Sequence, residues 1–80
     1  MAARITLTAK GRVYAELIHE AGDERRISPP PVIVALALSA QTTRETGSRA
    51  IHALERRGII RRDDEHLEMV SRSLLEELVV

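Results

Sequence analysis

Three consecutive prolines, Pro29-Pro30-Pro31, constrain the fold of this chain more than any other feature of its sequence. Proline has no amide hydrogen and forces the preceding residue toward extended geometry, so this segment cannot lie inside a helix. Pro31 can still occupy the first position of a new helix, because the first amide of a helix has no intrahelical partner to lose. The prolines therefore separate one set of elements before residue 29 from a second set after residue 31.

The part before the prolines contains one predicted amphipathic helix, from about Thr8 to Ala21. Apolar side chains recur there at steps of three and four residues, the spacing of a single helix face. This stripe consists of Val13, Tyr14, Leu17, Ile18 and Ala21. Gly22 is a natural C-terminal stop, and Ile27 is expected on a short strand. Residues 1–7 are expected to form an irregular or extended lead-in.

The run of residues 32–38 after the prolines is apolar without interruption. Its pattern is compatible with a buried strand, but we expect a short helix because of the sequence that follows. A helix that is apolar on all sides should be buried on most of them. We therefore expect Val32, Ile33 or Ala35 to be partly exposed or covered by another chain. The alternative is that Tyr14, the hairpin and the C-terminal helix cover them within the same chain.

A second amphipathic helix is predicted from about residue 43 to residue 57, after a turn at residues 39–41. Thr42 and Glu45 have the spacing of a capping box, which starts the helix at about residue 43. Gly58 ends it. Its buried stripe is Ala50, Ile51 and Leu54, and its opposite face carries Arg44, Glu45, Ser48, Arg49, His52 and Arg56.

The remaining sequence predicts a hairpin and a last helix. Residues 59–70 read as strand, turn and strand, with the turn at residues 63–65, and Ser71 or Ser73 could cap a helix that ends at Leu78. The order of elements predicts a mainly α fold with a small β-wing. This is a winged helix-turn-helix with a three-helix core, a β-hairpin and a short C-terminal helix. We expect a single domain over residues 1–80, with the helix-turn-helix at about 31–57 and the wing at about 59–70.

Length and composition exclude several classes of protein. Eighty residues make one domain, and the absence of cysteine excludes disulfides and thiol chemistry. No apolar run has the length of a signal peptide or a membrane span, so we expect a cytoplasmic protein. The three histidines lack metal-ligand spacing, and no nucleophile motif or glycine-rich phosphate loop is present. We expect no metal, no cofactor and no enzymatic activity.

The distribution of charge points to nucleic acid. Net charge is zero, with twelve basic and twelve acidic residues, which disfavours a general polyanion binder. Arginines nevertheless crowd residues 44–62, and a local basic face fits site-specific binding better than coating of DNA. Arginine can donate two hydrogen bonds to guanine, and glutamate can accept one from cytosine. The helix of residues 43–57 is therefore a candidate DNA-reading element for a major groove.

These residues also support a family resemblance. The resemblance rests on three segments. They are Leu36-Ala37 on the first helix of the motif, residues 42–49 with the sequence Thr-Thr-Arg-Glu-Thr-Gly-Ser-Arg, and residues 54–60 with the sequence Leu-Glu-Arg-Arg-Gly-Ile-Ile. Together they resemble the C-terminal DNA-binding domain of bacterial transcription factors of the cyclic-AMP receptor protein and fumarate-nitrate regulator type. The resemblance covers roughly residues 8–78.

The resemblance implies sequence-specific binding of double-stranded DNA and regulation of transcription. It implies that Arg44, Glu45 and Arg49 read base edges. It further implies that Thr43, Thr46 and Ser48 lie near phosphates or bases, and that Arg61 and Arg62 contact the DNA backbone from the wing.

Three departures from the family pattern limit these expectations. The effector-binding β-barrel and the long dimerisation helix do not fit in this chain, so we expect no ligand. A homodimer would form through residues 32–38 or through a missing N-terminal domain. Gly47 lies mid-helix, where glycine costs about 0.5–1 kcal/mol relative to alanine, and it could allow closer packing on the preceding helix. Gln41 stands where a turn glycine is expected, and the preceding helix lacks its usual polar face.

Two other interpretations remain open at this stage. Glu45 and Arg49 are four residues apart and could form a simple ion pair on a solvated helix face. The fold could also serve as a protein–protein interaction or dimerisation module without DNA binding. Neutral net charge and the apolar run favour that module, whereas the Arg-Glu-x-x-x-Arg face disfavours it.

Overall fold

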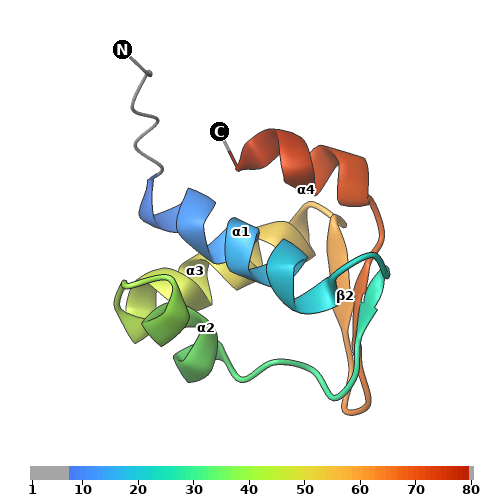
Figure 1. Ribbon diagram of the computed structural model, residues 1–80, viewed down its shortest axis with the longest axis horizontal. Helices are drawn as coiled ribbons and strands as arrows, with labels where there is room; N and C mark the ends of the chain where they lie inside the picture. The colour runs from blue at the N-terminus through green and yellow to red at the C-terminus, as the bar shows by residue number, and fades with distance from the viewer. Residues whose placement is uncertain (1–7, 80) are drawn as a thin grey trace.

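The computed structural model describes residues 8–79, which form four helices and three short strands (Figure 1). Their bounds are α1 Ala9–Ala21, β1 Arg26–Ile27, α2 Ile33–Ser39, α3 Arg44–Arg56, β2 Ile60–Arg62, β3 Leu67–Met69 and α4 Arg72–Leu78. This order confirms the predicted mainly helical winged helix-turn-helix. The expected lead-in of residues 1–7 lies outside the described residues.

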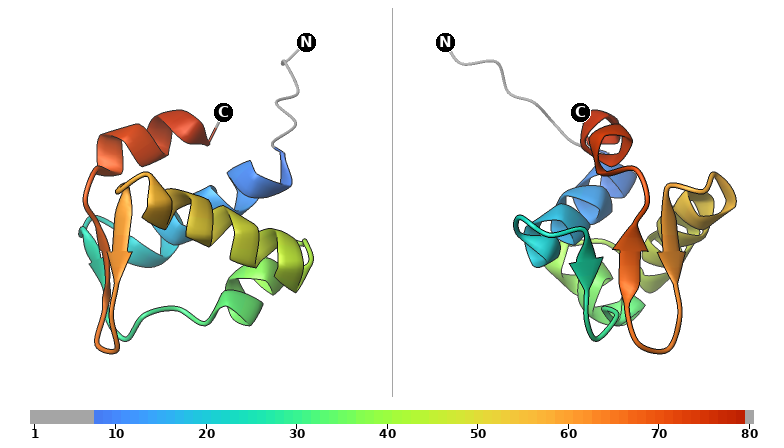
Figure 2. Two further views of the ribbon diagram at one scale, coloured as in Figure 1. Left: turned by 180° about the vertical axis from the view of Figure 1, so that it is seen from behind. Right: turned by 90° about the vertical axis from the view of Figure 1, so that its right-hand side faces the viewer.

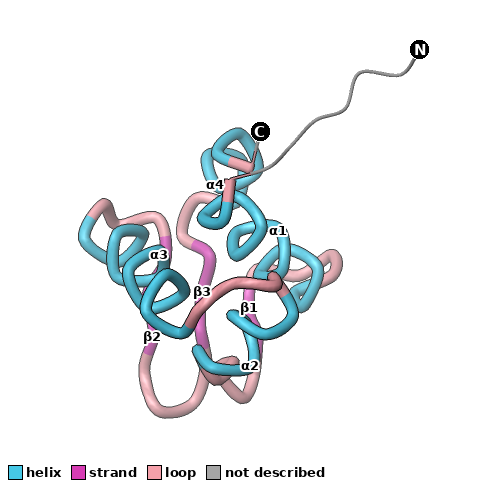
Figure 3. The backbone as a smooth tube through the Cα atoms, turned by 90° about the vertical axis from the view of Figure 1, so that its left-hand side faces the viewer, coloured by secondary structure: helices cyan, strands magenta, loops and turns pink. Residues whose placement is uncertain are grey.

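The helices pack around α1, which crosses the middle of the molecule (Figure 1). α2 and α3 lie against one side of α1, and α4 lies against another. The sheet stands at one end of this helical core, as the side and rear views in Figure 2 show. The tube in Figure 3 places the β2–β3 hairpin beside the C-terminal part of α3. The helix-turn-helix and the wing are thus fixed to the same core.

The strands form a small antiparallel sheet in the order β1-β3-β2. Ile60 pairs with Met69, and Ile27 pairs with Leu67. These apolar pairs face the helices, since Ile60, Leu67 and Met69 are fully buried. The outer face carries Arg26, Glu68 and Arg61, which lie side by side across the three strands. The sheet therefore supports the core with one face and exposes charge with the other.

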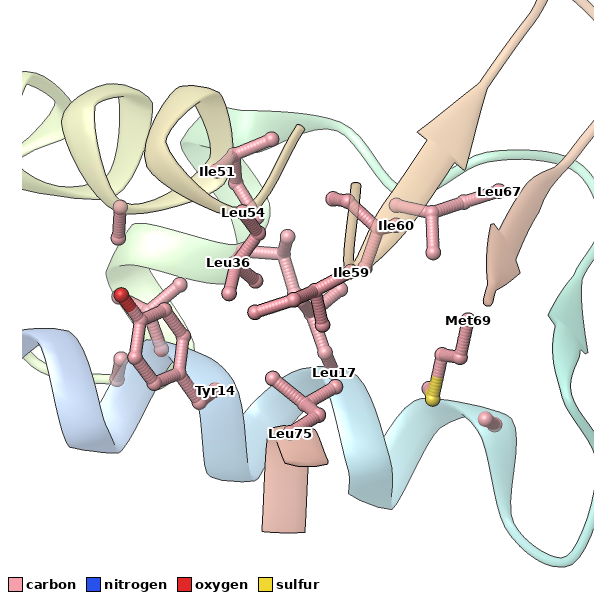
Figure 4. Packing of buried hydrophobic residues seen from close by; sticks show 14 residues of the cluster. Tyr14, Leu17, Leu36, Ile51, Leu54, Ile59, Ile60, Leu67, Met69 and Leu75 are labelled. Carbon is pink, nitrogen blue, oxygen red and sulfur yellow. The ribbon is translucent and has the colours of Figure 1, made fainter. Parts of the chain in front are cut away.

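The core is almost purely aliphatic, as the composition predicts (Figure 4). Leu17, Leu54, Ile59 and Leu75 are fully buried where α1, α3, the wing and α4 meet. Tyr14 is also buried, and this burial raises the pKa of its phenol, while nearby Arg57 acts in the opposite direction. Within residues 8–79 no polar or charged residue is buried, so the fold rests on apolar packing.

Gly47 allows α3 to approach α2 closely. A Cβ atom added at this glycine would lie 3.1 Å from the Cβ of Ala37 and 3.6 Å from Cγ2 of Ile33. The first distance is shorter than ordinary van der Waals contact, so a side chain here would push the two helices apart. The predicted role of Gly47 in close helix packing is confirmed.

Gln41 adopts the conformation that a turn glycine would normally supply. Its φ angle is 56°, in the left-handed region that costs a non-glycine residue roughly 1–2 kcal/mol. Hydrogen bonds on both sides of Gln41 close this turn. The Thr42 amide donates to the Ala37 carbonyl at 2.9 Å, and Arg12 Nε of α1 donates to the Ala40 carbonyl at 2.8 Å. These contacts hold α3 at a fixed angle to α2.

Two predicted helix starts were wrong by one or two residues. Pro31 is not the first residue of α2, because extended geometry continues through Val32, which is the N-cap. Thr42 is not the cap of α3, because its amide is used in the turn. The N-cap is Thr43, whose side-chain oxygen accepts from the Thr46 amide at 3.1 Å. For α4 the N-cap is Ser71, without a side-chain hydrogen bond.

Candidate nucleic-acid interface

The outward face of α3 is a straight stripe of polar side chains. Glu45, Arg49, His52 and Arg56 follow one another at helical spacing and are all exposed. The opposite face is buried through Gly47, Ala50, Ile51 and Leu54. This buried face anchors the helix, so the outward side chains project from a rigid support.

Two of the predicted base-reading residues form an ion pair with each other. Arg49 Nη2 lies 2.9 Å from Glu45 Oε2, and the two side chains are 71% and 73% exposed. An exposed pair of this spacing contributes only a few tenths of a kcal/mol, roughly 0.3–0.5. Arg44 is exposed in the first turn and makes no ion pair with any residue from 8 to 79. All three groups therefore point outward and are available to a partner.

The hydroxyl groups near the start of α3 are partly engaged. Thr43 Oγ1 caps the helix and also donates to Thr46 Oγ1 at 3.0 Å. Ser48 Oγ lies 3.4 Å from Nδ1 of His52. Thr43 is exposed, and Thr46 and Ser48 are half-buried, so all three remain accessible near the start of the helix.

The two wing arginines, Arg61 and Arg62, lie in different surroundings. Arg62 turns toward α3 and donates to both carboxylate oxygens of Glu55, at 3.0 and 3.2 Å. The side chains of this pair are only 25% and 29% exposed. Arg61 lies on the outer sheet face, 77% exposed and 3.8 Å from Glu68. The role of Glu55 had no signal in the sequence, because its partner lies seven residues away on another element.

The tip of the wing is acidic. Asp63 accepts hydrogen bonds from the amides of Glu65 and His66, at 2.8 and 2.9 Å. These bonds lower the pKa of Asp63 below its usual value of 3.8, so the carboxylate stays charged. Asp64 and Glu65 beside it are exposed. The end of the hairpin therefore presents negative charge.

The outer face of α2 is an uncovered apolar surface. Val32, Val34 and Leu38 are 65%, 42% and 71% exposed, and Ala35 is also exposed. The expectation of exposure in this run is confirmed for Val32 and Ala35, whereas Ile33 is half-buried. No other element between residues 8 and 79 covers these side chains.

Other types of site find no support in the part of the chain that the structure describes. No three histidine, aspartate or glutamate side chains gather there in a way that could hold a metal ion. None of its helices has the length and apolar character needed to cross a membrane.

Comparison with known proteins identifies the fold and the family. Residues 11–78 match the Crp-like helix-turn-helix domain family. The structure of FixK2 from Bradyrhizobium japonicum superimposes with a TM-score of 0.79 at 23% identity, which covers 92% of this chain and 39% of that protein.

The Thermus thermophilus catabolite activator protein superimposes with a TM-score of 0.71 at 36% identity, which covers 89% of this chain and 33% of that protein. The chain thus spans less than two fifths of the length of either protein. No curated protein sequence matches it. The chain belongs to the Crp-like helix-turn-helix domain family, whose members are DNA-binding modules of bacterial transcription regulators.

Proposed function

We propose that this chain binds specific DNA sequences by inserting α3 into a major groove and thereby regulates transcription. The observation that carries the proposal is the joint exposure of Arg44, Glu45 and Arg49 on a helix whose other face is buried. A major groove about 12 Å wide admits one helix, and the first turns of a recognition helix are the part that contacts base edges.

Each residue has a distinct proposed role. Arg44 and Arg49 donate to guanine edges, and Glu45 accepts from the amino group of cytosine. The Glu45–Arg49 ion pair favours one direction of the guanidinium before binding and is weak enough to open when DNA arrives. Thr43, Thr46 and Ser48 lie near phosphates or bases, where they position the helix without reading sequence.

The wing has a lesser proposed role. Arg61 is the better candidate for a phosphate contact because its side chain is largely exposed. Arg62 donates two hydrogen bonds to Glu55, so only its remaining N–H groups are available to the DNA backbone.

Selection of bound sequences from a random DNA pool tests the proposal directly. We expect an enriched half-site that contains guanines for Arg44 and Arg49. Arg44→Ala should then weaken binding to the selected sequence by about 1–3 kcal/mol, because one bidentate base contact is lost. Binding to random sequence should fall much less. Equal losses on both DNAs would reduce Arg44 to a phosphate contact, and absence of any enriched sequence would refute specific binding.

Pairing of two copies would increase affinity by adding a second half-site. Crp-like domains belong to dimeric regulators, and dimers of helix-turn-helix proteins read two half-sites about one helical turn apart. The exposed side chains of α2, above all Val32 and Leu38, favour pairing through residues 32–38. A region outside this chain is the other route. Light scattering of the wild-type chain and of Leu38→Glu distinguishes them, because only pairing through α2 depends on Leu38.

The same exposed face of α2 favours a second candidate, a protein–protein interaction module. The two functions differ in their response to salt. Phosphate contacts make the logarithm of the DNA affinity fall linearly with the logarithm of salt concentration, by about 0.9 per contact. An apolar protein contact through Val34 and Leu38 lacks this steep dependence.

A further inference from the structure

His52 is a residue of the outward stripe on α3 that carries no role in the proposed function. It lies between Arg49 and Arg56 on the same face, and its side chain is 55% exposed. Its Nδ1 atom faces Ser48 Oγ at 3.4 Å. The ring therefore lies along the exposed surface of the helix, with Ser48 beside Nδ1 and Glu55 at 4.0 Å from Nε2.

The position of His52 along the helix selects a phosphate as its partner. Seven residues separate it from Glu45, which is about 10 Å of helix rise. The major groove is about 12 Å wide. When the first turn of α3 reaches the bases, a side chain two turns later lies at the level of the groove edge, where the phosphates are.

The charges around the ring allow it to bind an anion. Glu55 Oε1 is the nearest carboxylate oxygen, 4.0 Å from Nε2, but Arg62 of the wing already donates to both oxygens of that carboxylate. Asp63 and Asp64 of the hairpin share a shallow hollow of about 310 Å³ with this pair, and His52 is not among the residues that line it.

On α3 itself the ring has a cation on either side. Arg49 lies one turn before it and is paired with Glu45, and Arg56 lies one turn after it and is exposed. Within residues 8–79, each carboxylate beside the ring thus already has a cation partner. A protonated imidazole there would find its strongest new partner in a phosphate.

We propose that His52 is a further DNA-contacting residue, which donates to a backbone phosphate in its protonated form and makes DNA affinity depend on pH. This inference rests on the proposed function of α3. Histidine changes charge near neutral pH, so the phosphate gains a charged donor as the pH falls. Affinity should therefore rise from pH 8 to pH 6 while the base contacts of the arginines stay the same.

The test measures binding of the intact chain to its selected DNA duplex at pH 8.0 and pH 6.0, each over a series of salt concentrations. We expect on the order of fivefold tighter binding at pH 6.0. The slope of log affinity against log salt should also become steeper by about 0.9 at pH 6.0, the value of one added phosphate contact.

Three variants complete the test. His52→Gln should lose both changes, and His52→Lys should bind tightly at both pH values. His19→Gln, an exposed histidine on α1, is the matched control and should behave like the wild type. Because His52 is exposed, its replacement should leave the circular dichroism spectrum unchanged.

The failures of the two proposals differ. If the wild type binds selected DNA at pH 8.0 and Arg44→Ala weakens it, but His52→Gln keeps the full pH dependence, the role of His52 is refuted and that of α3 stands. If the wild type binds no DNA at either pH, both proposals fail.

Discussion

Helix α3 and the wing carry similar numbers of charged groups but arrange them in opposite ways. On α3 the cations face solvent, and the only ion pair among the proposed base-reading residues is an exposed one between Arg49 and Glu45. On the wing Arg62 is held by Glu55 in a half-buried bridge, and the hairpin tip is acidic through residues 63–65.

This difference shows where a neutral chain can concentrate its affinity for DNA. An exposed pair at i and i+4 is weak and opens readily, whereas a half-buried bridge with two hydrogen bonds does not. The wing therefore contributes structure and local negative charge, and on the proposed function most of the attraction for phosphate and bases comes from α3, with Arg61 as the smaller contribution of the wing. A neutral protein with a single basic face gains little from non-specific contacts.

The largest expected effect comes from removing a proposed base contact on α3. Arg49→Ala should cost about 1–3 kcal/mol of binding to the selected sequence, because a base contact is lost, and it leaves Glu45 unpaired. Arg61→Ala should lower the salt slope by at most about 0.9 and act equally on all sequences. Fluorescence anisotropy with selected and random duplexes measures both. A larger loss for Arg61 than for Arg49 would reverse the assignment.

The sequence predicted the elements that depend on local pattern. The apolar stripes of α1 and α3, the stop at Gly22 and the close approach at Gly47 all follow from residue type and spacing. Helix starts were less certain, because Thr42 and Thr43 are both good caps and only the turn to Ala37 decides between them. The orientation of Arg62 could not be predicted, since it depends on where the hairpin folds back against Glu55.

The second prediction concerns the Glu55–Arg62 bridge, which keeps the Arg62 guanidinium from contacting DNA fully. Glu55→Gln should destabilise the fold by about 1 kcal/mol, because Arg62 loses a charged, half-buried acceptor. At pH 8 it should also strengthen binding to random DNA and steepen the salt slope by up to about 0.9, because a guanidinium is released. Urea unfolding and anisotropy measure the two effects.

A surface bridge provides the control for this variant. Glu76 pairs with Arg72 on α4 at 3.0 Å but is 54% exposed. Glu76→Gln should therefore cost only a few tenths of a kcal/mol, roughly 0.3, and leave DNA binding unchanged. If Glu55→Gln weakens binding to random DNA, Arg62 already contacts phosphate in spite of its bridge.

The third prediction concerns the two turns that flank α3. Gln41 lies in the turn before α3 and has a φ angle of 56°. Gly58 lies in the turn between α3 and the wing and has a φ angle of 73°. Gln41→Gly should stabilise the fold by roughly 0.5–1 kcal/mol. Glycine has no energetic penalty in the left-handed region, and its larger loss of backbone entropy on folding offsets only part of this gain. Gly58→Ala should destabilise it by about 1 kcal/mol, although a Cβ there meets nothing within 4 Å. Thermal unfolding gives both signs, and the same sign for both would show that packing, not backbone geometry, controls these turns.

The smallest effect tests the turn of the wing itself. The amides of Glu65 and His66 lower the pKa of Asp63 in the folded state, so its ionised form stabilises the hairpin above the ordinary pKa of aspartate. That contribution is lost as the pH falls from about 4 through the lowered value. Asp63→Asn keeps an acceptor oxygen but has no charge, so the wild type should be slightly more stable at pH 7. This advantage should shrink toward pH 3. Urea unfolding of both proteins across this range measures the difference, and a gap that stays constant with pH would mean that the hydrogen-bond geometry, and not the charge of Asp63, holds the tip.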